Sequence, residues 1–115
     1  MGRVYRPIEV SCNHQRRITV GLVDTGADET VVSQRLANEV GVSLYGNYTA
    51  RCASQYTLQE KYADVTITDL VTGKSIIITV GVSDVPFHTD DIDDEGLEVI
   101  LGIDFIQETN MEIKA

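Results

Sequence analysis

The residues best suited to chemistry are Asp24-Thr25-Gly26, a triplet that directly follows an apolar stretch. Hydrolysis of a peptide bond needs one carboxylate to take a proton from water and one carboxylic acid to protonate the carbonyl oxygen. Asp24 can supply one of these two groups. The triplet alone is weak evidence, because Asp, Thr and Gly are common turn residues, and both Asp24 and the nearby Asp28 could serve only to hold a turn.

Two strand ends share this pattern. Residues 17–23 are rich in β-branched side chains, which predicts a strand ending at the triplet. Residues 100–104, Ile-Leu-Gly-Ile-Asp, again place apolar strand residues before a glycine and an aspartate. We expect these two strand-to-turn corners to lie side by side.

The positioning scaffold is expected to be made mainly of strands. One β-hairpin is predicted from residues 8–12 and 17–23, and a second from residues 62–68 and 75–82. The alternation in residues 110–115 predicts a terminal strand, whose open edge could pair with a second subunit.

Short helices are expected at two places. Ser33 is a suitable N-cap and Gly41 a suitable stop, which predicts a helix between them. The residues after Gly102 are also compatible with a helix. Asp104 either caps that helix or accepts hydrogen bonds from backbone N–H groups near Thr30, and both alternatives are structural roles.

Two segments resemble a known family. Residues 20–32, Val-Gly-Leu-Val-Asp-Thr-Gly-Ala-Asp-Glu-Thr-Val-Val, resemble the active-site segment of retropepsins, the aspartic peptidases of retroviruses and their cellular relatives. Residues 99–106, Val-Ile-Leu-Gly-Ile-Asp-Phe-Ile, are similar to the glycine corner and helix near the family's C-terminus. Viral members carry an arginine where Ile103 stands, so the resemblance is closer to cellular and prokaryotic relatives.

The resemblance implies an all-β fold, a closed, barrel-like retropepsin (acid protease) domain with one or two short helices, covering residues 1–115. It also implies an aspartic endopeptidase. The chain holds one Asp-Thr-Gly, so a second Asp24 must come from the other subunit of a homodimer. Two adjacent carboxylates cannot both ionise easily, an effect for which aspartic proteases are the standard example, and an optimum at about pH 4 to 6 is expected. No metal or cofactor is implied.

The family also implies roles around the catalytic aspartate. Thr25 would hold the two subunits' loops together, and Gly26 would allow a close approach to the carboxylates. Ala27 and Asp28 would lie along a protein or peptide substrate. Gly102 would form the structural corner.

The flap that covers the cleft in this family corresponds to residues 48–58, which contain no glycine. Small residues at Ala50, Cys52 and Ala53 are the candidate substrate contacts there. Without the viral arginine, dimer stability would depend on apolar packing and on strands from residues 3–10 and 111–115. The altered flap keeps a second hypothesis open, a catalytically silent module for dimerisation or peptide binding.

Composition excludes other classes of function. The formal net charge is −9 and no basic face is predicted, so no nucleic acid partner is expected. No apolar run could span a membrane and no signal peptide is evident, which predicts a soluble, cytoplasmic protein. Cys12 and Cys52 are expected to be free thiols. The acidic run 90–95 predicts a solvated loop in preference to a calcium site or a partner-binding loop.

Overall fold

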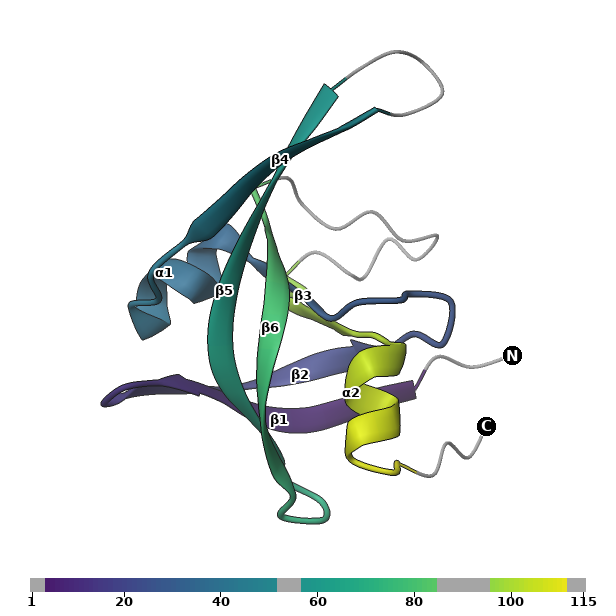
Figure 1. Cartoon of the computed structure of the whole chain (residues 1–115). Helices are drawn as coiled ribbons and strands as arrows, with labels where there is room; N and C mark the ends of the chain where they lie inside the picture. The colour runs from purple at the N-terminus through teal and green to yellow at the C-terminus, as the bar shows by residue number, and fades with distance from the viewer. Residues whose placement is uncertain (1–3, 52–56, 85–95, 112–115) are drawn as a thin grey trace.

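The computed structural model describes residues 4–51, 57–84 and 96–111, and the side chains of 4–44, 61–84 and 96–111 (Figure 1). Seven strands and two short helices form in these ranges. In chain order they are β1 (Val4–Cys12), β2 (Gln15–Val23), β3 (Val31–Ser33), α1 (Gln34–Val40), β4 (Tyr45–Arg51), β5 (Thr57–Asp69), β6 (Ser75–Ser83), β7 (Val99–Leu101) and α2 (Ile103–Glu108).

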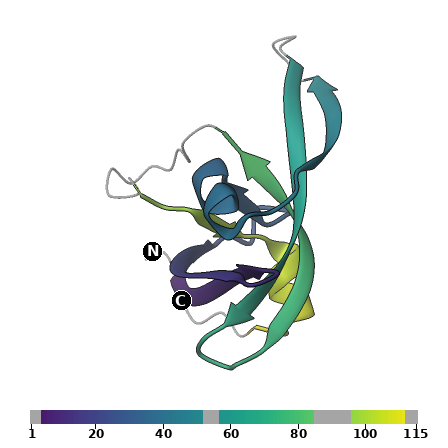
Figure 2. The ribbon, with the colours of Figure 1, turned by 90° about the vertical axis from the view of Figure 1, so that its left-hand side faces the viewer.

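The strands form one sheet that closes on itself. Their order is β1-β2-β7-β3-β6-β5-β4, and β1 also pairs with β5, so every strand except β4 belongs to a closed six-stranded barrel. Figure 2 shows the hairpin of β4 and β5 extending away from this barrel. The expected all-β, barrel-like fold with short helices is confirmed.

Both predicted hairpins are present and longer than expected. β1 pairs with β2 in antiparallel register from Val4↔Val23 to Cys12↔Gln15. β5 pairs with β6 from Lys61↔Val82 to Thr68↔Ser75. Alternation along β1 turns Ile8 inward and exposes its neighbour Pro7, as period-two patterning requires.

The two predicted corners do lie side by side. β2 runs parallel to β7, with Leu22 opposite Ile100 and Val23 opposite Leu101. β7 in turn pairs with β3. The two short strands therefore fix the positions of the segments that follow Val23 and Leu101.

Helix α1 begins and ends as predicted. The side chain of Ser33 accepts a hydrogen bond from the Leu36 N–H, 3.1 Å away. Gly41 takes the left-handed conformation, with φ of 71°. Its N–H and the Val42 N–H donate to the carbonyls of Asn38 and Ala37, which is a Schellman motif.

The first two residues of the strand predicted at 110–115 belong instead to the end of α2. Asn110 has a φ of 51°, and the N–H of Met111 donates to the Ile106 carbonyl, so these two residues close the helix. Residues 112–115 lie outside the described part of the chain. Within the described ranges, neither helix has the length and apolar character required to cross a membrane.

The core fills the barrel and the space beneath the helices. Its largest buried side chains come from five strands and both helices: Phe105, Ile8, Leu36, Ile67, Leu101, Val10, Val32, Val40, Val80 and Val99. Phe105 of α2 and Leu36 of α1 are both fully buried. The packed core therefore supports the corner that follows β7 as well as the loop that follows β2.

Candidate active site

Asp24 lies at the end of β2 and is half-buried. Its backbone N–H donates to the Leu101 carbonyl at 2.9 Å, which joins the triplet to the end of β7. Its side chain accepts a hydrogen bond from the Gly26 N–H, with 2.9 Å between that nitrogen and Oδ1. One carboxylate oxygen is therefore held in place by the loop's own backbone.

The loop from Asp24 to Glu29 has one side exposed to solvent, and its other side is hydrogen-bonded to the residues after β7. Thr25, Gly26, Asp28 and Glu29 are exposed, whereas Asp24 and Ala27 are half-buried. A Cβ at position 26 would lie 3.3 Å from Oδ1 of Asp24, so glycine leaves room beside the carboxylate. The exposed side can meet another molecule without any rearrangement of the core.

The middle of this loop is tied to the corner after β7. The Ile103 N–H donates to the Ala27 carbonyl at 2.7 Å. A Cβ at position 102 would lie 2.5 Å from the carbonyl carbon of Glu29 and 2.9 Å from the Ala27 carbonyl oxygen. Only glycine allows the two backbones to approach so closely, which gives Gly102 its structural role in this subunit.

Asp104 braces the end of the loop, as one of its two predicted roles required. Its Oδ2 accepts from the Thr30 N–H at 3.1 Å, and its Oδ1 accepts from the Thr30 hydroxyl at 2.7 Å. Oδ1 also accepts from the N–H of the next residue, Phe105. The N-cap residue of α2 is Gly102, which has no side chain to cap the helix.

Sequence reasoning missed the part that Thr30 plays in this network. Thr30 is fully buried, and its hydroxyl also accepts a hydrogen bond from the Gly102 N–H at 3.1 Å. A threonine placed six residues after Asp24 was the available signal. Its partners, however, are more than 70 residues away in sequence.

The predicted flap is described only in part. β4 pairs with β5 in antiparallel register, with Ala50 opposite Leu58 and Arg51 opposite Thr57. Cys52 and Ala53 lie outside the described residues, as does the acidic run 90–95. The expected contacts of Ala50, Cys52 and Ala53 with substrate therefore stay predictions.

A second carboxylate with several hydrogen bonds, Asp69, lies at the C-terminal end of β5. Asp69 is 1% exposed, and Arg6 binds it through two N–H···O bonds of 2.8 Å each. This ion pair, together with hydrogen bonds from Val71 and Thr72, lowers the pKa of Asp69 to about 2. Sequence reasoning missed this pair, which joins β1 to the end of β5 and stabilises the turn between β5 and β6.

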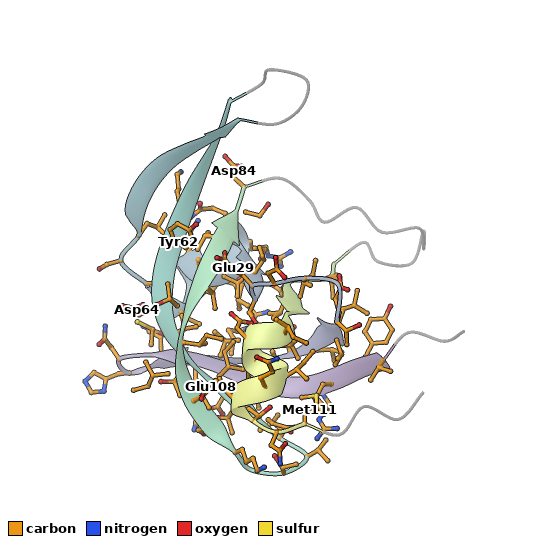
Figure 3. The ribbon with its side chains drawn as sticks, turned by 45° about the vertical axis from the view of Figure 1, so that its right-hand side comes forward. Glu29, Tyr62, Asp64, Asp84, Glu108 and Met111 are labelled. Atoms are coloured by element: carbon orange, nitrogen blue, oxygen red, sulfur yellow. The ribbon has the colours of Figure 1, made fainter. Side chains whose placement is uncertain are left out.

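Acidic side chains around the barrel come from separate elements. Figure 3 shows Glu29 on the loop after β2, Asp64 on β5, Asp84 beyond β6 and Glu108 on α2. Across residues 4–51, 57–84 and 96–111, no three His, Cys, Asp or Glu side chains are grouped to hold a metal ion. Cys12 is a free thiol.

Solved structures with the same architecture include two proteases and a protease-like domain. EIAV protease complexed with the inhibitor HBY-793 has a TM-score of 0.69 and 20% identity, over 99% of this chain and 94% of that chain. The retroviral protease-like domain of Ddi1 from Leishmania major has a TM-score of 0.59 and 17% identity, over 99% and 82%. A retropepsin-like aspartic protease from Rickettsia conorii has a TM-score of 0.51 and 20% identity, over 100% and 91%. The fold is that of the retropepsin-like class.

The family follows from the sequence itself. The model of the family described as gag-polyprotein putative aspartyl protease matches residues 8–108, and the chain belongs to this family. That range contains the triplet at Asp24 as well as the corner at Gly102 and Asp104. No curated protein sequence matches the chain.

Proposed function

We propose that this protein is an aspartic endopeptidase that works as a homodimer, with one Asp24 from each subunit. The observation that carries the proposal is the placement of Asp24. Its carboxylate is half-buried at a strand end, oriented by the Gly26 N–H, on a loop whose other side is tied to the core. The membership in an aspartyl protease family supports the same reading.

The chemistry requires two carboxyl groups in different protonation states. The ionised Asp24 takes a proton from water as the water oxygen attacks the scissile carbonyl carbon, and the protonated Asp24 of the partner gives its proton to the carbonyl oxygen. The tetrahedral diol then collapses as the partner's Asp24, now ionised, takes a proton from one of the diol's hydroxyls. The C–N bond breaks, and the amine nitrogen receives a proton from the first Asp24. No covalent intermediate with the enzyme forms.

The neighbouring residues have supporting roles in this proposal. Thr25 and Gly26, both exposed, lie where a second subunit can approach the triplet. Ala27 and Asp28 lie along an extended peptide, and the exposed carboxylate of Asp28 accepts hydrogen bonds from its amides. Ala50, Cys52 and Ala53 on the flap are proposed to cover the substrate.

The test compares wild type with Asp24→Asn on an unfolded protein and on a peptide library, from pH 3 to pH 8, at equal subunit concentration. We expect Asn to lower the cleavage rate by roughly 10²- to 10⁴-fold, since an amide cannot exchange the proton. The rate of the wild type should rise more steeply than linearly with subunit concentration until the dimer saturates. Asp84→Asn, an exposed aspartate beyond β6, is the matched control and should cleave normally.

A second function, a silent dimerisation or peptide-binding module, is favoured by the flap segment 48–58, which lacks glycine. A fold alone does not secure an activity. The same cleavage assay, together with a measurement of peptide binding, distinguishes the two functions. A folded, dimeric wild type that binds peptides and cleaves none of them across this pH range would refute the peptidase proposal and support the binding module.

A further inference from the structure

Thr30 occupies the last position of the active-site loop, immediately before β3. It is 0% exposed, and every polar group it carries has a partner. Its N–H and hydroxyl donate to the two oxygens of Asp104, and its carbonyl accepts from the Gly81 N–H at 3.0 Å. Its hydroxyl also accepts from the Gly102 N–H.

The hydroxyl of Thr30 connects Asp104 to Gly102 because it donates one hydrogen bond and accepts another. It gives its proton to Oδ1 of Asp104 and receives the N–H of Gly102. A serine retains both functions, whereas a valine of nearly the same shape retains neither. Loss of the hydroxyl would leave the buried Gly102 N–H without its partner, which is costly in a packed interior.

Hydrogen bonds at three positions, Asp24, Ala27 and Thr30, connect the loop to the corner after β7. The first joins the Asp24 N–H to the carbonyl at the end of β7, and the second joins the Ala27 carbonyl to the Ile103 N–H. All three of these connections end on residues 101–104, so the loop and the corner share one set of hydrogen bonds. We therefore expect a shift at Thr30 to displace Ala27, Asp28 and the carboxylate of Asp24.

We propose that Thr30 is a positioning residue for peptide hydrolysis, acting through Gly102 and Asp104 on the placement of Asp24. The inference rests on the proposed peptidase function and adds a residue that touches no substrate. A misplacement of about 1 Å at a reacting group can lower a rate by about 100-fold. We expect the loss of rate to appear in kcat and not in KM, since the buried Thr30 makes no contact with the peptide.

The test uses three variants. Thr30→Val removes the hydroxyl, and Thr30→Ser retains it. Thr72→Val is the matched control, because the Thr72 hydroxyl also donates to a buried carboxylate, Asp69 at 2.9 Å, and also accepts from a backbone N–H, that of Lys74. That network stabilises the turn between β5 and β6, and within the described ranges its hydrogen bonds go to residues other than those of the loop.

Rates are measured at subunit concentrations that saturate the dimer. We expect Thr30→Val to lower kcat by about 10- to 100-fold with KM changed by less than about 3-fold, Thr30→Ser to restore kcat, and Thr72→Val to leave kcat unchanged. Thr30→Val with a wild-type kcat would overturn the proposal, as would an equal loss in Thr72→Val. If Thr30→Val does not fold, Asp104→Asn takes its place, because an amide has one acceptor oxygen, whereas the N–H and the hydroxyl of Thr30 use both oxygens of the carboxylate.

A readout without catalysis separates this inference from the proposed function. The Gly26 N–H bond to Asp24 can be followed by the NMR shift and the exchange rate of the Gly26 amide. Faster exchange in Thr30→Val, with no change in Thr72→Val, supports positioning even if the wild type cleaves nothing. An unchanged Gly26 amide in Thr30→Val refutes it, whatever the wild type's activity.

Discussion

Arg6 and Asp69 form the ion pair whose pH dependence is best defined. Because the pKa of Asp69 in the folded protein is about 2, below its ordinary 3.8, the ionised form stabilises the fold. That contribution is fully present above about pH 4 and is lost as the pH falls through about 2. The pair therefore persists across an acidic optimum of about pH 4 to 6, where a peptidase of this class would work.

Asp69→Asn should lower the free energy of unfolding by about 2 kcal/mol at pH 6, since the pKa shift of nearly two units is removed. At pH 2.5 the difference between variant and wild type should shrink by more than half, because wild-type Asp69 is then partly protonated. Urea denaturation at both pH values measures this. A difference that stays constant with pH would show that packing, and not charge, causes the loss.

Gly102→Ala tests the closeness of the two backbones at the corner. The added Cβ would lie 2.6 Å from the Glu29 carbonyl oxygen, and backbone atoms cannot give way cheaply. We expect a loss of about 1 to 3 kcal/mol in the free energy of unfolding. Gly81→Ala is the control, because its Cβ would meet Val31 at an ordinary 3.6 Å, and a similar loss there would contradict the steric argument.

The range of each contact along the chain explains which residues could be predicted from sequence. Gly26 and Asp24 are bonded two positions apart, inside a recognisable motif. The Thr30 hydroxyl and Asp104 are 74 positions apart, and Arg6 and Asp69 are 63 apart. The two alternatives for Asp104 could be named before the structure was known, but no pattern in the sequence predicted the partner of Arg6.

At the scale of elements, α1 depends on its N-cap residue, Ser33. Ser33 accepts the Leu36 N–H, and the helix packs Leu36, Ala37 and Val40 into the core. Ser33→Ala should cost about 1 kcal/mol in thermal or urea unfolding and leave kcat unchanged, because α1 carries no residue of the loop. Ser75→Ala, which removes an exposed hydroxyl, should change stability by less than about 0.5 kcal/mol. Equal losses in the two variants would refute the capping role.

The helices and hairpins were predicted better than the short strands. Ser33 and Gly41 mark α1 by local chemistry, and the alternation in β1 and β2 is visible in the sequence. β3 and β7 have three residues each, too few to show a period. Only the repeated corner of apolar residues, glycine and aspartate indicated that the segment before Gly102 pairs beside the segment before Asp24.

At the scale of the whole molecule, closure of the barrel needs contacts that no local pattern specifies. β1 pairs with β5 through Ile8↔Asp69 and its neighbours, and β7 lies between β2 and β3. The resemblance to a family supplied this topology. The net charge, in contrast, can be counted directly from the sequence, and it bears on assembly.

Each subunit has a formal net charge of −9, so two copies approach each other against repulsion. Salt screens this repulsion, since the Debye length falls from about 30 Å at 0.01 M to about 3 Å at 1 M. For the proposed homodimer we expect the dissociation constant, measured by sedimentation equilibrium at pH 7, to fall several-fold between these salt concentrations. Glu108→Lys changes the charge from −9 to −7 and should tighten the dimer at low salt and reduce the salt dependence. A dimer that weakens as salt is added would instead show that opposite charges pair across its interface.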